Sequence, residues 1–270
     1  MLPLALVLFA LAGAAAIFAI AFALARRVNN FGIVDVVWSL GFAPLAGLYA
    51  WASSGLPLRR TLIAAMAIMW SLRLGGHLAR RVLGHLDVED ARYAQLRRDW
   101  AGRFELKMFD FFQLQALLLV VLATPFLLAA ANPAPALHPL ELAGVVLAAL
   151  AVTGEAVADA QLAAFKRNPA RRGQVCDVGL WRWSRHPNYF FEWLVWVAFA
   201  LFALPAPHGW LALGSPVLML HFLLRVTGIP YTEAQLLRSK GDAYRRYQQR
   251  TSAFFPWLPA RPPTSCSSQS

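Results

Sequence analysis

Residues Leu2–Ala25 read LPLALVLFALAGAAAIFAIAFALA, an apolar run that contains no charged side chain. A helix needs about 20 such residues to cross the hydrocarbon core of a bilayer. The run is too long for a secretory signal peptide, and it has neither a basic start nor a small-residue cleavage motif before its end. It therefore predicts a transmembrane helix.

Similar runs follow along the chain. The other predicted spans are Ile33–Ala52, Thr61–Ala79, Phe109–Ala130, Leu140–Phe165, Tyr189–Leu204 and Trp210–Val226, of which the last two are shorter. Hydrophobic residues make up 59% of the chain and charged residues only 14%, whereas soluble domains are about half apolar and a quarter charged. An open sheet is excluded, because lipid cannot satisfy its edge.

These features predict an all-α polytopic membrane protein, a bundle of about seven transmembrane helices. Residues 1–258 are expected to form one domain, because the length suits a single bundle. Residues 259–270 are expected to be a disordered tail, because they are rich in Pro and Ser.

The basic residues lie in alternate loops. A net charge of +11 is compatible with nucleic-acid binding. We reject that partner, because the charges sit in short clusters between apolar runs, where membrane topology places them. Residues 132–139 and 205–209 carry no Lys or Arg, and only Arg59 and Arg60 break the alternation. The positive-inside rule then predicts an N-terminus outside the membrane and a C-terminus in the cytoplasm.

Asp35 lies near the start of the second span, in NNFGIVDVVW at residues 29–38. An ionisable side chain inside a membrane is costly, so each one is a functional hypothesis. Asp35 and Trp38 are three residues apart and share a helix face. Asp35 is either an interfacial carboxylate at a helix end or a group lining a cavity, where a protonated carboxyl can donate a hydrogen bond. Trp38 is predicted to contact the substrate.

Other ionisable groups recur at helical spacing. Each set either holds the bundle together or lines a site, and the spacing leaves both readings open. The sets are Glu155, Asp159 and Lys166 in the fifth span, Arg73 and His77 in the third, and His221 and Arg225 in the last. The tract DVEDARY at residues 87–93 is likewise either a solvated face or part of a site.

The densest motif is GLWRWSRHPNYFFEW at residues 179–193. Pro187 suits the first turn of a helix. Arg185 and His186 then precede a helix N-terminus, where backbone N–H groups favour an anion. Arg182 adds a donor suited to phosphate. Asn188 and Glu192 are one helical turn apart and point the same way; the alternative is that the basic residues only mark the membrane boundary.

The C-terminal segment places Tyr244, Tyr247 and Arg250 at one-turn intervals. It is either an amphipathic helix on the membrane surface or a lid over a cofactor. The chain has no Gly-rich nucleotide-binding motif, so a nucleotide site would be built from helix ends and side chains. Cys176 and Cys266 form no metal or redox motif, and no metal site is predicted.

Four stretches of this sequence resemble a known family. Gly179–Trp193 and Tyr231–Trp257 are similar to the C-terminal half of the steroid 5-alpha-reductase family. Asp35–Trp38 and Glu89–Tyr93 are similar to the N-terminal motifs of its bacterial branch, so the resemblance runs from about Asn29 to Trp257. Arg-His-Pro-Asn-Tyr alone is less specific, because sterol reductases and isoprenylcysteine carboxyl methyltransferases share it in some form.

The resemblance implies a monomeric enzyme of the bacterial inner membrane, surrounded by lipid. Its reaction would be the NADPH-dependent reduction of a carbon–carbon double bond conjugated to a ketone, in an apolar substrate such as a 3-oxo-Δ4 steroid. Asp35 corresponds to the family's catalytic carboxylate, and Tyr93 is the candidate phenol partner. The chain departs from many relatives at Phe191, where they have Gly.

The expected NADPH contacts combine residues that the resemblance carries over with those of the basic motif. They are Arg73, Asp159, Lys166, Arg182, Arg185, His186, Asn188, Tyr189, Glu192, Tyr244, Tyr247 and Arg250.

Two other function classes are compatible with parts of the sequence. The residues Glu233, Leu236, Gly241, Tyr244 and Tyr247 also resemble the ending of the isoprenylcysteine carboxyl methyltransferases, which bind S-adenosylmethionine. That group usually has two adjacent acidic residues where this chain has Thr232-Glu233. It also usually has a Gly two residues after the tyrosine of Pro-x-Tyr, which this chain lacks. Both differences weigh against a methyltransferase. The third class is a non-catalytic lipid- or sterol-binding protein, against which the intramembrane carboxylates and the phosphate-suited loop argue.

Overall fold

The computed structural model describes residues 3–260, and the chain is helical over most of that range. The elements are α1 (Pro3–Val28), α2 (Ile33–Ala52), α3 (Pro57–Leu83), α4 (Ala91–Asp99), α5 (Phe104–Leu122), α6 (Thr124–Ala131), α7 (Pro139–Arg167), η1 (Pro169–Arg171), η2 (Gly179–Arg182), α8 (Pro187–Ala203), η3 (Gly209–Leu213), α9 (Gly214–His221), η4 (Phe222–Val226), α10 (Ile229–Lys240) and α11 (Asp242–Arg250). Within the described residues β-pairing is limited to an isolated bridge between Ser184 and Ser252. The all-α prediction is confirmed.

Six helical stretches of the described chain are long and apolar enough to cross a membrane. They are Leu4–Val28, Ile33–Ala52, Pro57–Leu83, Phe104–Ala131, Pro139–Arg167 and Gly209–Lys240. The predicted span at Tyr189–Leu204 corresponds to α8, which has 17 residues and is shorter than the roughly 20 that a span needs. A multi-pass membrane protein is thus supported, but a count of seven spans is not confirmed.

The last span also differs from its predicted end at Val226. The helical run continues to Lys240 through the π-helical turn η4. Of the predicted tail, residues 259–260 have no helix, and residues 261–270 lie outside the described range.

The chain divides into two compact units. The first comprises the described residues up to Ala148 together with Val197–Leu218, and the second comprises Ala149–Trp196 with the described residues from Met219 onward. The assignment of residues 1–258 to one domain stays a prediction.

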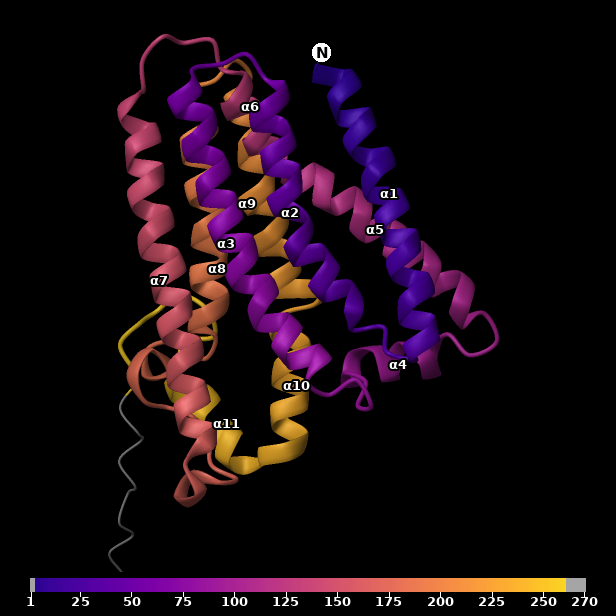
Figure 1. Cartoon of the computed structure of the whole chain (residues 1–270). Coiled ribbons are helices and arrows are strands. Elements are labelled where there is room, and N and C mark those ends of the chain that lie inside the picture. The colour runs from indigo at the N-terminus through magenta and orange to yellow at the C-terminus, as the bar shows by residue number, and fades with distance from the viewer. Residues whose placement is uncertain (1–2, 261–270) are drawn as a thin grey trace, which may run out of the picture. The chain divides into compact units, whose positions relative to one another are not determined.

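In the first unit α2 packs along α3, and α1 packs along α5 (Figure 1). Small residues bring α2 and α3 together, as is common between membrane helices. A Cβ at Gly75 would overlap the side chain of Leu40. Ser71 donates a hydrogen bond to the carbonyl of Ser39 at 2.6 Å and accepts one from the amide of Ala43 at 3.1 Å.

The face of α1 that packs inward is lined by small and apolar residues at helical spacing: Leu6, Ala10, Ala14, Phe18, Ala21 and Ala25 are all buried. The remaining surface of the helix carries exposed large apolar side chains such as Phe9 and Ile20. Water would penalise that surface, whereas lipid tails are as apolar as the side chains themselves. The helix is therefore suited to a membrane environment.

A buried ion pair lies in the first unit, between Arg59 of α3 and Glu141 of α7. Both side chains are 0% exposed. The Arg59 guanidinium also donates to the carbonyls of Asn132, Ala134 and Ala136 at 3.0, 2.8 and 2.5 Å. One of the two charges that interrupt the alternation of basic loops is thus neutralised inside the protein, and the 132–138 loop is tied to α3.

In the second unit the C-terminal half of α7 packs against the start of α8. A Cβ at Gly154 would overlap the ring of Phe191, so the absence of a side chain at position 154 makes room for the phenyl ring. The indole N–H of Trp181 donates to the carbonyl of Ala158 at 2.9 Å. Phe191, which departs from the Gly of many relatives, is accommodated by this close approach of α7.

Candidate functional site

The first polar cluster forms at the N-terminal end of α2. Arg92 Nη2 donates to Asp35 Oδ2 at 2.7 Å, and the hydroxyl of Tyr93 donates to Asp35 Oδ1 at 2.7 Å. The Asp35 side chain is 17% exposed, and Tyr93 is buried. The predicted catalytic pair, Asp35 and Tyr93, is therefore brought into direct contact.

Asp90 positions Arg92. Its carboxylate caps α4 by accepting the amide of Arg92 at 3.0 Å, and it also accepts Arg92 Nε at 3.1 Å and Arg81 Nη2 at 2.8 Å. Burial works against the charged form of Asp90, but the hydrogen bonds and charge of Arg92 prevail and lower its pKa. Arg92 thus bridges two carboxylates, Asp35 and Asp90, which restricts its guanidinium to one place.

A second set of contacts places the loop that precedes α4. The amide of Phe31 donates to Glu89 Oε1 at 3.2 Å, and Arg97 pairs with Glu89 at 3.2 Å. Asn30 Nδ2 donates to the carbonyl of Leu86 at 3.1 Å. Both links join the residues just before α2 to the tract 86–89, so part of the tract DVEDARY packs against the protein.

The geometry settles which way the hydrogen bond of Asp35 runs. Burial, followed by the charge of Asp35, raises the pKa of Tyr93 well above its usual range, so the phenol keeps its proton and directs it at Asp35. Both Asp35 oxygens accept hydrogen bonds. In this structure Asp35 accepts one hydrogen bond from the phenol of Tyr93 and one from the guanidinium of Arg92.

Trp38 lies one turn along α2 from Asp35. Its indole Nε1 is buried and has no hydrogen-bond acceptor among residues 3–260. The ring packs edge-on against Phe42, with centroids 4.8 Å apart at 89°.

The second polar cluster lies in the second unit and is centred on Glu233 of α10. Glu233 Oε1 accepts from Arg185 Nε at 2.7 Å and from the Tyr244 hydroxyl at 3.4 Å, and Oε2 accepts from Gln248 Nε2 at 2.9 Å. Arg185 Nη1 also donates to the carbonyls of Gln248 and Thr251 at 3.0 and 2.6 Å. These contacts fasten the turn before α8 to α10 and α11.

His186 belongs to the same cluster. Its Nε2 lies 3.3 Å from Glu233 Oε1, and its ring stacks on Tyr189 with centroids 5.3 Å apart. Burial lowers the pKa of His186 even though Glu233 favours the charged form. The imidazole is therefore neutral at neutral pH, and it adds no charge to a phosphate site.

Two predicted cofactor residues meet across α7 and α8. Asn188 Nδ2 donates to Asp159 Oδ1 at 3.4 Å. Glu192, one turn further along α8, is buried and accepts the indole N–H of Trp196 at 3.2 Å. The burial of Glu192 agrees with the expectation that this face of α8 points into the protein.

The remaining predicted cofactor residues have different surroundings. Tyr247 is buried and donates to the carbonyl of Trp181, and Arg250 pairs with Asp177. Burial raises the pKa values of both Tyr244 and Tyr247. Lys166 and Arg182 are exposed. Arg73 lies in α3 and belongs to the first unit.

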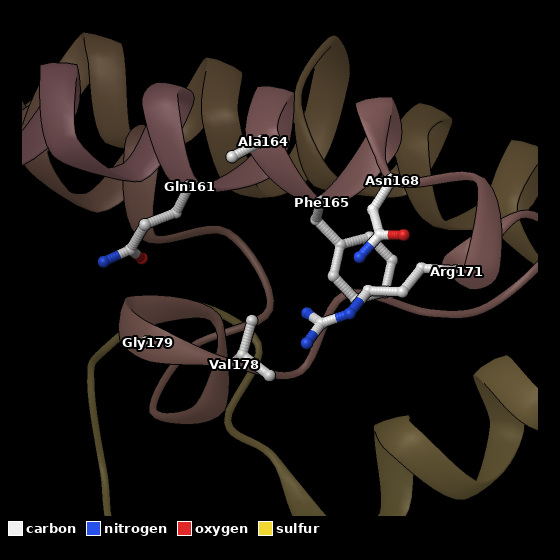
Figure 2. A pocket seen from close by; sticks show the side chains of 7 residues that line it. All are labelled: Gln161, Ala164, Phe165, Asn168, Arg171, Val178 and Gly179. Carbon is white, nitrogen blue, oxygen red and sulfur yellow. The ribbon is translucent and has the colours of Figure 1, made fainter.

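A shallow pocket of about 280 Å³ opens beside the end of α7. Figure 2 shows its lining residues Gln161, Ala164, Phe165, Asn168, Arg171, Val178 and Gly179. The guanidinium of Arg171 lies over the Phe165 ring, 5.0 Å from its centroid. Gln161 Oε1 accepts the amide of Leu180 at 2.9 Å, so both walls of the pocket are held by local contacts.

The comparisons with known proteins give a family. Residues 21–251 match the family described as "Protein of unknown function (DUF1295)", which covers most of the chain. The chain belongs to the DUF1295 family. It is also similar to "Uncharacterized protein C594.04c" of Schizosaccharomyces pombe, with 34% identity over 88 residues, which span 30% of this chain and 23% of that protein. No solved structure matched the chain.

The cation set of this DUF1295 chain fits a phosphate-bearing cofactor in part. Lys166, Arg171 and Arg182 are exposed at the surface of the second unit, and guanidinium groups suit phosphate oxygens. Arg185 and Arg250, in contrast, already hold the carboxylates of Glu233 and Asp177. A phosphate at either of these two would have to displace a protein carboxylate, whereas Lys166, Arg171 and Arg182 are exposed.

Several polar residues of the clusters were missing from the predicted site, among them Arg92, Asp90, Glu233 and Gln248. Arg92 and Asp90 belong to the tract DVEDARY, which already stood out by its mixture of charges. Glu233 lies in the stretch Tyr231–Trp257, and the methyltransferase resemblance singles it out. Gln248 carries no sequence signal, because an exposed-looking glutamine in a polar helix is ordinary.

Proposed function

We propose that this protein is an NADPH-dependent membrane reductase. Its reaction would saturate a carbon–carbon double bond conjugated to a ketone in an apolar substrate such as a 3-oxo-Δ4 steroid. The observation that carries the proposal is the hydrogen bond from the hydroxyl of the buried Tyr93 to the side chain of Asp35, which is also paired with Arg92. The resemblance of Asp35–Trp38 and Gly179–Trp193 to the steroid 5-alpha-reductase family supports the same reaction.

The cofactor, when bound, would supply a hydride to the β carbon of the enone, with NADP⁺ as the product. Negative charge then develops on the carbonyl oxygen, and the α carbon takes up a proton. Donors aimed at that oxygen lower the barrier. Tyr93 holds a proton for this purpose, and Asp35 stays paired with Arg92 when the hydroxyl turns from the carboxylate toward a substrate oxygen.

The second unit would hold the cofactor. Lys166, Arg171 and Arg182 supply charge for its phosphates, and Asn188 with Asp159 supplies polar contacts near the start of α8. Several cations and no acid after a Gly-rich turn favour the 2′-phosphate of NADPH over the ribose hydroxyl of NADH.

The proposed topology places the N-terminus outside a bacterial inner membrane and the C-terminus in the cytoplasm. Loops rich in Lys and Arg stay in the cytoplasm. Arg59, one of the two residues that break the pattern, is fully buried against Glu141. A neutralised arginine inside the protein no longer opposes this orientation.

Cofactor binding and turnover test the proposal. Purified protein in detergent should bind NADPH, and it should oxidise NADPH when a 3-oxo-Δ4 steroid is added. Tyr93→Phe should retain NADPH binding and lose turnover, because it removes only the hydroxyl. Failure of the wild-type protein to bind NADPH would refute the reductase.

One observation favours a second candidate, an S-adenosylmethionine-dependent methyltransferase of the isoprenylcysteine carboxyl methyltransferase type. Glu233, one of the residues that carry that resemblance, is the centre of the second polar cluster and contacts Arg185, His186 and Tyr244. Binding of S-adenosylmethionine with no binding of NADPH would select this alternative.

A further inference from the structure

We propose that the indole N–H of Trp38 donates a hydrogen bond to the carbonyl oxygen of the substrate, and that this contact selects an apolar ligand carrying a ketone. The inference rests on the proposed reductase function and deepens it by naming the donor that recognises the substrate class.

The starting observation is a buried donor without an acceptor. Nε1 of Trp38 is shielded from solvent and has no hydrogen-bond partner within residues 3–260. A buried tryptophan N–H usually finds a partner, and native proteins leave few buried polar groups unsatisfied. A partner from outside the protein therefore accounts for the position of this group.

The indole is held in place by packing. Its ring meets the ring of Phe42 edge-on, with centroids 4.8 Å apart at 89°. Phe42 is fully buried and packs in turn on Trp70, with centroids 5.2 Å apart. A donor with a restricted ring direction suits recognition, because little freedom is lost when the ligand binds.

Trp38 also lies on the same helix face as Asp35. Residues three apart in a helix are neighbours on its surface and are separated by about 4.5 Å along the axis. The hydroxyl of Tyr93 donates a hydrogen bond to Asp35, and Arg92 donates hydrogen bonds to Asp35 and Asp90. The donors of this cluster are thus engaged within the protein, whereas the Trp38 N–H has no acceptor within residues 3–260.

The chemistry of the indole limits what it can meet. Its N–H donates and cannot accept, so the ligand must present an acceptor atom. The neighbouring Phe42 ring is apolar, which favours an acceptor on an otherwise apolar molecule. A ketone oxygen meets both requirements, and its two lone pairs allow a second donor, Tyr93, when the hydroxyl turns toward it.

The test compares two steroid probes on the full-length protein in detergent. One is a 3-oxo-Δ4 steroid, and the other is the same Δ4 steroid without the 3-oxygen. The variants are Trp38→Phe, which keeps an aromatic ring but removes the N–H, and the matched control Trp51→Phe on the same helix, where the side chain is 80% exposed. If Trp38→Phe disturbs folding, 3-benzothienylalanine at position 38 serves instead. It replaces the indole N–H by sulfur and preserves the shape of the ring. NADPH binding is measured in parallel.

Wild-type protein and Trp51→Phe should bind the ketone about fivefold more tightly than the deoxy steroid, as expected for one net hydrogen bond. The two changes at position 38 should abolish that preference while the affinity for the deoxy steroid and for NADPH stays the same. The inference would be overturned if the variants at position 38 still prefer the ketone steroid, or if the wild-type protein binds neither steroid. If the wild-type protein does not bind NADPH but still prefers the ketone steroid, the proposed reductase function would be refuted while the role of Trp38 in ligand binding would stand.

Discussion

The hydroxyl of Tyr93 donates to Asp35 at 2.7 Å, although the two residues are 58 positions apart in the chain. Arg92 holds the other oxygen of the same carboxylate at 2.7 Å. A phenol, a carboxylate and a guanidinium are thereby joined where α4 meets the start of α2. This arrangement leads to the first two predictions.

Asp35→Leu should abolish reduction of an enone while NADPH binding persists, because it removes the group that orients Tyr93. Asp35→Asn should retain part of the activity, since the amide oxygen still accepts the Tyr93 hydroxyl. A loss on the order of 10²–10⁴-fold in kcat is expected for Asp35→Leu, because Tyr93, the proposed proton-bearing group, is no longer held in place. Arg92 remains bound to Asp90 in both variants, so the fold should survive. Full turnover by Asp35→Leu would leave Asp35 a structural carboxylate.

Stability should fall at alkaline pH, and Tyr93 should contribute to the fall. The pKa of Tyr93 is raised in the folded protein. Its contribution is therefore complete below the unfolded value of about 10 and is lost as the pH rises through the folded pKa. Thermal unfolding of the wild type between pH 8 and pH 11 should show a larger drop in Tm than that of Tyr93→Phe. Equal drops in the two proteins would contradict the assignment.

The buried pair of Arg59 and Glu141 should behave unlike an exposed one. Arg59→Met or Glu141→Leu alone should cost about 3–5 kcal/mol, because each leaves a buried charge without its partner. The double variant should recover much of that loss. Arg26 and Glu105 are the matched control, with side chains 60% and 55% exposed, and neutralising that pair should change stability by at most about 1 kcal/mol. Denaturant unfolding in detergent measures the stability of the two single variants, the double variant and the control. If the losses of the two single variants add up in the double variant, Arg59 and Glu141 are not coupled.

Gly154 should be required by the aromatic ring at position 191. Gly154→Ala should destabilise by about 1–3 kcal/mol, because the new methyl group overlaps the Phe191 ring. Combining it with Phe191→Ala should relieve the overlap and give a coupling of about 0.5–3 kcal/mol. Gly13→Ala is the control, since a Cβ there meets nothing within 4 Å, and it should be neutral or stabilising. Absence of coupling between positions 154 and 191 would show that the contact does not matter.

Two arginines of the motif at residues 179–193 should respond differently to truncation. Arg182 is exposed, so Arg182→Ala should weaken NADPH binding several-fold, and more than NADH binding, with Tm unchanged. Arg185 pairs with Glu233 at 2.7 Å, so the main effect of Arg185→Ala should be a lower Tm. Isothermal titration calorimetry measures the loss of NADPH affinity, and thermal unfolding measures the loss of stability. Unchanged NADPH affinity in Arg182→Ala, and also in Arg171→Ala, would remove this surface from the cofactor site.

Local features of the sequence predicted the helical class and most of the spans. The length of an apolar run is a property of consecutive residues, so the stretch Leu2–Ala25 and its successors could be recognised without any tertiary contact. One predicted span was not confirmed, and the end of another was placed too early. α8 has 17 residues, and the last helical run continues to Lys240 through a π turn that composition does not reveal.

The sequence by itself also determined which groups are costly to place in a membrane, and so pointed to Asp35. Only the tertiary structure decided what accompanies them. Arg92 rather than Arg73 or His77 proved to be the cation bonded to Asp35, and Glu141 neutralises Arg59 from 82 positions away. Long-range ion pairs and hydrogen bonds depend on how helices pack, and packing follows from side-chain shapes on several elements at once, which no local pattern contains.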